Sequence, residues 1–101
     1  MNREVLEGYI VDIACLRKYP HSQVAQRAVD HSRDCVLMGH CIESGYGLVD
    51  NDGRILLLDT EATRAVIESV SRAIQSRGIR IRVRREMENG EMLTRSVELA
   101  E

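Results

Sequence analysis

Soft metal-binding residues gather in one short stretch of the sequence. His31, Cys35 and Cys41 fall within eleven residues, and the same stretch also holds His40. The third cysteine, Cys15, lies upstream of them. Three thiolates and one imidazole are a common tetrahedral ligand set for zinc, and thiolates also bind Cu(I). The sequence therefore predicts a metal site formed by Cys15, His31, Cys35 and Cys41, with structural zinc as the first choice and Cu(I) as the second.

The spacing of these residues supports part of this ligand set. Residues four apart share one face of a helix, so His31 and Cys35 could both reach one ion from a single helix. The spacer between Cys35 and Cys41 is longer than the usual spacer of about two to four residues between paired ligands. His40 or His21 could replace His31, and the sequence does not decide between them.

Two other interpretations use the same residues. Cysteines often pack as small buried hydrophobic residues, and both Cys15 and Cys35 belong to apolar patterns. A thiol-based redox or catalytic protein would use Cys35 or Cys41 with His31. Against this second interpretation, Cys35 is expected near a helix end, where the helix dipole raises the pKa of a thiol. A Cys35–Cys41 disulfide also lacks the Cys-x-x-Cys spacing of thioredoxin-like sites. Whether the protein is an enzyme stays open.

Composition and charge narrow the class of protein. The chain has 101 residues, enough for one domain, of which 44% are hydrophobic and 30% are charged. Neither Trp nor Phe occurs, so the core must be mainly aliphatic. The net charge of −2 gives no general attraction to nucleic acid or membrane, and no apolar run reaches the ~20 residues of a membrane span. With no secretory signal and an odd number of cysteines, the sequence predicts a cytoplasmic protein with reduced thiols.

Around the cysteines, the hydrophobic pattern changes from that of a strand to that of a helix. Residues 5–15 are rich in β-branched and aromatic side chains and predict a strand, with Gly8 at a bend or bulge. Asp12 would lie either on the solvent face of this strand, which we expect, or as a buried partner of the segment that follows. A single helix is expected over residues 23–39, with the histidine and first cysteine of the cluster on one face.

A hairpin and a second helix are expected in the middle of the chain. Residues 45–59 contain two apolar runs that flank Asn51-Asp52-Gly53, a strong hairpin signal. Residues 62–74 repeat apolar positions at helical spacing, and Gly78 is suited to end that helix.

Two further strands are expected at the C-terminal end. Residues 79–85 and 92–100 alternate between apolar and polar side chains, which is the strand period. Their apolar faces match, with Ile81 opposite Val97, if a three-residue loop at 88–90 joins the strands through a bulge.

The order of these elements is that of the OB-fold, a five-stranded and partly open Greek-key barrel. We therefore expect one OB-like domain over residues 1–101, mainly β with two helices (α+β). A helical insert over residues 14–44 would lie between strands 1 and 2, where loops of this fold often carry the ligand site. A connection of about thirty residues is too long to stay structureless in a compact domain, so a metal would help to hold it.

An arginine-rich strand is the other feature that bears on partners. Five arginines fall between Arg77 and Arg85, and an OB-type nucleic-acid binder could use the Arg80–Arg84 strand face to contact phosphates. Nearby glutamates balance that charge and no aromatic residues interleave to stack bases, so we favour a solvated face. If the strand lies at a sheet edge, it could pair with a second copy of the chain or with an unknown protein partner.

The run GYIVDIAC, followed by HSRDCVLMGHCIESGYGLV, resembles a group of small bacterial domains of uncertain function. The shared pattern is a glycine, Val-Asp and a cysteine in the first strand, then a histidine, two cysteines and two glycines: Gly8, Val11, Asp12, Cys15, His31, Cys35, Cys41, Gly45 and Gly47. The resemblance covers about the first half of the chain. It implies a small β-barrel that carries cysteine and histidine residues, with no settled activity.

Overall fold

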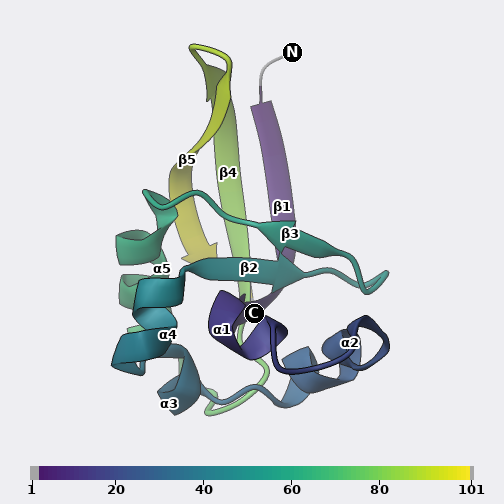
Figure 1. Ribbon diagram of the computed structural model, residues 1–101. Coiled ribbons are helices and arrows are strands. Elements are labelled where there is room, and N and C mark those ends of the chain that lie inside the picture. The colour runs from purple at the N-terminus through teal and green to yellow at the C-terminus, as the bar shows by residue number, and fades with distance from the viewer. Residues whose placement is uncertain (1–2, 101) are drawn as a thin grey trace.

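One antiparallel sheet of five strands organises the chain (Figure 1). The computed structural model describes residues 3–100, apart from the side chains of His21, His40 and Cys41. Across the sheet the strands lie in the order β3 (Ile55–Leu57), β2 (Tyr46–Val49), β1 (Arg3–Asp12), β4 (Arg80–Glu88) and β5 (Glu91–Leu99). The first four strands thus have the order of a Greek key.

The sheet is open. Strands β3 and β5 are its two edges, and they do not pair with each other within residues 3–100. The expectation of a mainly β fold with five strands and additional helices is confirmed, whereas closure into a barrel is not confirmed. No helix in the described part of the chain is both long enough and apolar enough to span a membrane.

The connection between β1 and β2 contains four short helices instead of the single long helix that we expected. These are α1 (Ile13–Leu16), α2 (His21–Asp30), α3 (Arg33–Val36) and α4 (Gly39–Ser44). Together with α5 (Ala62–Ser71), which precedes β4, the chain has five helices within its described residues, and the expectation of two is wrong.

Side-chain caps explain why the insert is divided. The Asp12 side chain accepts a hydrogen bond from the Cys15 amide, which ends β1 and begins α1, so the strand stops three residues earlier than expected. Helix α2 ends before His31, whose backbone is extended (φ −65°, ψ 127°). Ser32 then caps α3 by accepting from the Cys35 amide over 3.1 Å. Gly39 begins α4 and does not end a helix.

The apolar residues pack on both faces of the sheet. Successive residues of a strand point to opposite faces, so Ile10 and Val11 of β1 belong to different clusters. Ile10 packs in the main aliphatic core, which α5 supplies with Val66 and Val70. Val11 packs with residues of α2 and β2. The helix expected over 62–74 is confirmed only as far as Ser71, and Ile74 is 91% exposed.

The two hairpins differ in how well the sequence predicts them. The turn between β2 and β3 lies at the expected Asn51-Asp52-Gly53, with a positive φ of 79° at Gly53.

The loop between β4 and β5 contains residues 89–90 alone, both with positive φ (51° and 84°), as a two-residue type I′ turn requires. The expected three-residue loop is therefore wrong, and Ile81 lies opposite Leu99, not Val97. A β-bulge between Arg84 and Arg85 shifts the register by one residue. Val83 therefore lies opposite Val97, and the apolar faces of the two strands still match.

Gly8 permits the closest approach between β1 and β2. A Cβ atom at this position would lie 2.5 Å from the Val49 carbonyl oxygen, which is backbone and cannot rotate away. We expect Gly8→Ala to lower the free energy of unfolding by about 1–3 kcal/mol, the usual cost of overpacking. Gly39→Ala is the matched control, because a Cβ there meets nothing within 4 Å. Urea denaturation of both variants tests this, and equal stabilities would contradict it.

Candidate metal centre

Asp12 is a buried carboxylate at the end of β1, with no exposed surface. One of its oxygens accepts from the Cys15 amide and the other lies 2.8 Å from His31 Nε2. The expectation that Asp12 faces solvent is wrong, because the insert folds back over the end of the strand. The structure instead agrees with the alternative reading, in which Asp12 is a buried partner of the insert.

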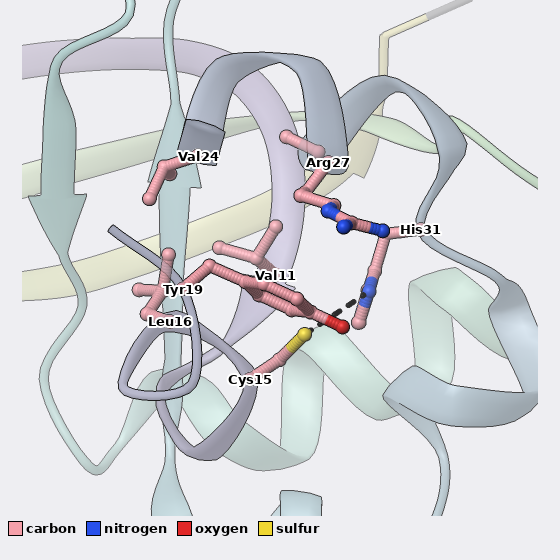
Figure 2. A pocket seen from close by; sticks show the side chains of 8 residues that line it. Val11, Cys15, Leu16, Tyr19, Val24, Arg27 and His31 are labelled. Carbon is pink, nitrogen blue, oxygen red and sulfur yellow. Dashed lines mark hydrogen bonds between the residues drawn. The ribbon is translucent and has the colours of Figure 1, made fainter. Parts of the chain in front are cut away.

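His31 lies between α2 and α3, and its side chain is also buried. An ionised carboxylate only accepts hydrogen bonds, so His31 Nε2 must donate to Asp12. In the neutral ring, Nδ1 then carries a free lone pair. His31 Nδ1 lies 3.7 Å from Cys15 Sγ, and Figure 2 shows the thiol directed toward the imidazole. The structure therefore brings together two of the four predicted ligands.

The Cys15 thiol is half-buried in α1. Burial is the main cause that raises the pKa of the Cys15 thiol above its ordinary value. The neighbouring Asp12 carboxylate and the Cys35 thiol raise the pKa further. The positive charges of Lys18 and Arg27 act against this rise. Because an ordinary thiol already titrates above neutral pH, Cys15 is a protonated thiol in the metal-free protein at pH 7.

Cys35 completes a cluster of metal-binding side chains. Asp12, His31 and Cys35 each offer one ligand atom, and these three atoms lie within 4.8 Å of one another. Cys15 and Cys35 are both free thiols, so neither forms a disulfide. His31 and Cys35 do not share one helix as expected, because α2 ends before His31 and Cys35 lies in α3.

Three residues that we considered as ligands lie outside what the structure describes. The backbone of Cys41 and His40 belongs to α4 and that of His21 to α2. Their side chains are outside the described residues, so their roles as ligands stay predictions. No protein-family model, curated protein or solved structure matches the chain.

Sequence reasoning missed Asp12 as the partner that orients His31. The signal was present, since Asp-x-x-Cys follows an apolar strand in the manner of a helix N-cap. Ser32 and Cys35 repeat the same spacing with a serine cap. Both cysteines of the described site thus lie three residues after a capping side chain, in the first turn of a short helix.

The alternate arginines of β4 form ion pairs with glutamates of the two neighbouring strands. Arg82 contacts Glu7 of β1 at 3.1 Å and Glu98 of β5 at 3.2 Å. Arg80 also contacts Glu7, and Arg84 also contacts Glu98. This ladder of ion pairs across three strands agrees with the solvated face that we favoured over a phosphate-binding surface.

Loss of the Asp12 carboxylate should destabilise the fold. We expect Asp12→Ala to lower the free energy of unfolding by about 2–4 kcal/mol, because it removes a helix cap and leaves the buried His31 donor unpaired. Asp12→Asn should cost less, since the amide oxygen can still accept from Cys15. Asp52→Ala, at an exposed carboxylate, should change stability by less than about 0.5 kcal/mol. Thermal and urea unfolding measure these differences, and equal losses in Asp12→Ala and Asp52→Ala would contradict the role of Asp12.

The raised pKa of the Cys15 thiol predicts slow alkylation. In the metal-free protein, a higher pKa leaves less thiolate at pH 8, and the thiolate is the reactive form. Peptide-resolved mass spectrometry should show that iodoacetamide modifies Cys15 with a pH midpoint higher in the folded protein than in the same chain in urea. A midpoint at or below that of the unfolded chain would refute the expected shift.

Proposed function

We propose that this protein is a metal-binding domain in which a soft transition metal, with zinc as the first choice, ties the insert to the sheet. The observation that carries the proposal is the cluster of Asp12, His31 and Cys35 ligand atoms within 4.8 Å of one another. Thiolate and imidazole ligands suit zinc and also Cu(I). A reducing compartment such as the cytoplasm would keep the thiols available for the metal.

We assign Cys15, His31 and Cys35 as the ligands and Asp12 as the residue that orients His31. Cys15 lies outside the cluster of Asp12, His31 and Cys35, and its contact with His31 supports its place in the set. Usual zinc–sulfur and zinc–nitrogen distances at a tetrahedral angle place the two ligand atoms ~3.6 Å apart. The distance between Cys15 Sγ and His31 Nδ1 is 3.7 Å. Both Asp12 oxygens already accept hydrogen bonds, one of them from His31 Nε2. A carboxylate that accepts from the second nitrogen of a metal-binding histidine is a common outer-shell arrangement.

The fourth coordination position would be filled either by Cys41, as the sequence predicts, or by a ligand from solution. In either case the metal would join α1 and α3 to His31, which follows α2. A metal shared by these segments would stabilise a connection that is otherwise built from one-turn to three-turn helices. Binding energy would therefore contribute directly to folding.

We also propose that the sheet is an open variant of the OB-fold. The strand order has the Greek-key arrangement, and the insert follows the first strand, where this fold often carries its ligand site. Contacts from Thr94 of β5 to Asp59, just after β3, bring the two edges toward each other. If the edges close in solution, amide hydrogens on the outer edge of β5 should exchange slowly, and rapid exchange there would contradict closure.

A thiol-based activity is the second candidate, because Cys15, His31 and Asp12 lie in the order of a nucleophile, its base and an orienting carboxylate. This arrangement uses Cys15, whereas the sequence suggested Cys35 or Cys41 as the thiol. The raised pKa of the Cys15 thiol weighs against a preformed thiolate. Metal-free protein as isolated, with one thiol that reacts much faster than the others, would favour this activity over metal binding.

Metal titration of the reduced, full-length protein tests the proposed function. We expect one Co²⁺ or Zn²⁺ per chain, cobalt–thiolate charge-transfer absorption, and protection of Cys15 and Cys35 from alkylation until a chelator is added. Asp12→Asn should weaken binding by about 10–100-fold, the usual effect of removing an outer-shell partner. Cys15→Ser, Cys35→Ser and His31→Gln should each weaken binding further, because they remove a ligand.

Gln26→Ala is the matched control, since it changes an exposed residue of α2 in the same insert and should leave the affinity unchanged. Circular dichroism of each variant separates lost binding from lost folding. Absence of cobalt–thiolate absorption in the wild-type protein would contradict the proposal, as would full affinity in Cys15→Ser.

A further inference from the structure

A small pocket lies directly beside the proposed metal ligands. Cys15 and His31 form part of its wall, and Figure 2 shows their side chains facing the same space as Tyr19 and Arg27. The remaining wall is aliphatic and consists of Val11, Leu16, Val24 and Ala28. The space that a water-sized group can reach is about 10 Å³, enough for one such group, and the pocket is partly open to solvent.

Arg27 brings a positive charge to this otherwise apolar wall. Its guanidinium carbon lies 4.3 Å from the centre of the Tyr19 ring, so the tyrosine face holds the side chain in place. No carboxylate of the described residues forms an ion pair with Arg27, whereas the arginines of β4 contact glutamates. A cation without a carboxylate partner at the mouth of an apolar pocket favours the entry of an anion.

Building on the proposed metal site, we propose that the remaining coordination position opens into this pocket and binds a small monovalent anion, with Arg27 as its counter-charge. Two thiolates and a neutral imidazole cancel the charge of a divalent metal, and the Asp12 carboxylate behind His31 adds −1. Arg27 is the positive charge on the pocket side of the site that attracts the anion. A third thiolate from Cys41 would instead fill the position and leave no place for a ligand from solution.

The consequence is a site of the open kind, with three protein ligands and one exchangeable ligand. Closed four-ligand sites are typical of structural zinc, whereas an exchangeable position is typical of catalytic zinc. The size of this space restricts the bound atom to about the size of water, and the opening to solvent lets the rest of a short linear anion extend outward. Azide meets both conditions, and its binding to Co²⁺ changes the visible absorption spectrum of the metal.

Azide titration of the Co²⁺-loaded, full-length protein tests the proposal. At constant ionic strength, azide should change the visible cobalt spectrum saturably, and perchlorate should not change it. Arg27→Gln should weaken azide binding by about tenfold, as expected for loss of a charged hydrogen-bond donor, and Arg27→Lys should retain most of the affinity. Arg64→Gln, at an exposed position of α5, is the matched control and should behave as wild type.

The outcomes separate this proposal from the proposed function. Normal cobalt–thiolate absorption that does not respond to azide would overturn the open position and leave metal binding intact. A response that appears only in Cys41→Ser would overturn it too, by showing that Cys41 fills the position. An azide response that is equal in wild type and Arg27→Gln would overturn the role of Arg27. Absence of cobalt absorption would overturn both proposals together.

Discussion

The Asp12 carboxylate lies fully buried where β1 passes into the insert, and a buried carboxylate is costly unless its oxygens are hydrogen-bonded. One oxygen accepts from the Cys15 amide and so begins α1, while the other accepts from His31 Nε2. These two bonds join the sheet to both ends of the segment that contains α1 and α2. They also set the direction of the His31 ring, so that Nδ1 faces the Cys15 thiol. The geometry of the candidate site depends on this one carboxylate.

A second set of contacts, between backbone groups, also holds the insert in place. The backbone after α2 pairs with the segment before β4: Arg33 donates to the Ser76 carbonyl, and the Gly78 amide donates to the His31 carbonyl. Gly78 has a positive φ of 60°, and a Cβ there would lie 2.5 Å from the Val29 carbonyl oxygen. Only glycine satisfies both conditions without strain. His31 is therefore fixed through its backbone by one contact and through its ring by another, which is the rigidity that a binding site needs.

Local patterns account for the parts of the fold that the sequence predicts well. The strand pairs and α5 follow from hydrophobic periodicity and from turn residues such as Gly53. Division of the insert is harder to predict, because Asp12 and Ser32 start new helices through side-chain hydrogen bonds that interrupt a continuous apolar stripe. Ile74 fits the stripe of α5 but is exposed, because the helix ends at Ser71. The metal-binding residue types are visible in the sequence, whereas the bond between Asp12 and His31 forms only when the tertiary fold brings them together.

The tautomer of His31 shows most directly whether Asp12 orients this ring. Long-range ¹H–¹⁵N NMR of the histidine rings in the reduced protein distinguishes a protonated nitrogen from one with a free lone pair. We predict that His31 carries its proton on Nε2, and that one equivalent of zinc shifts the Nδ1 resonance while Nε2 stays protonated. A proton on Nδ1 in the metal-free protein, or a His31 spectrum that zinc leaves unchanged, would contradict it.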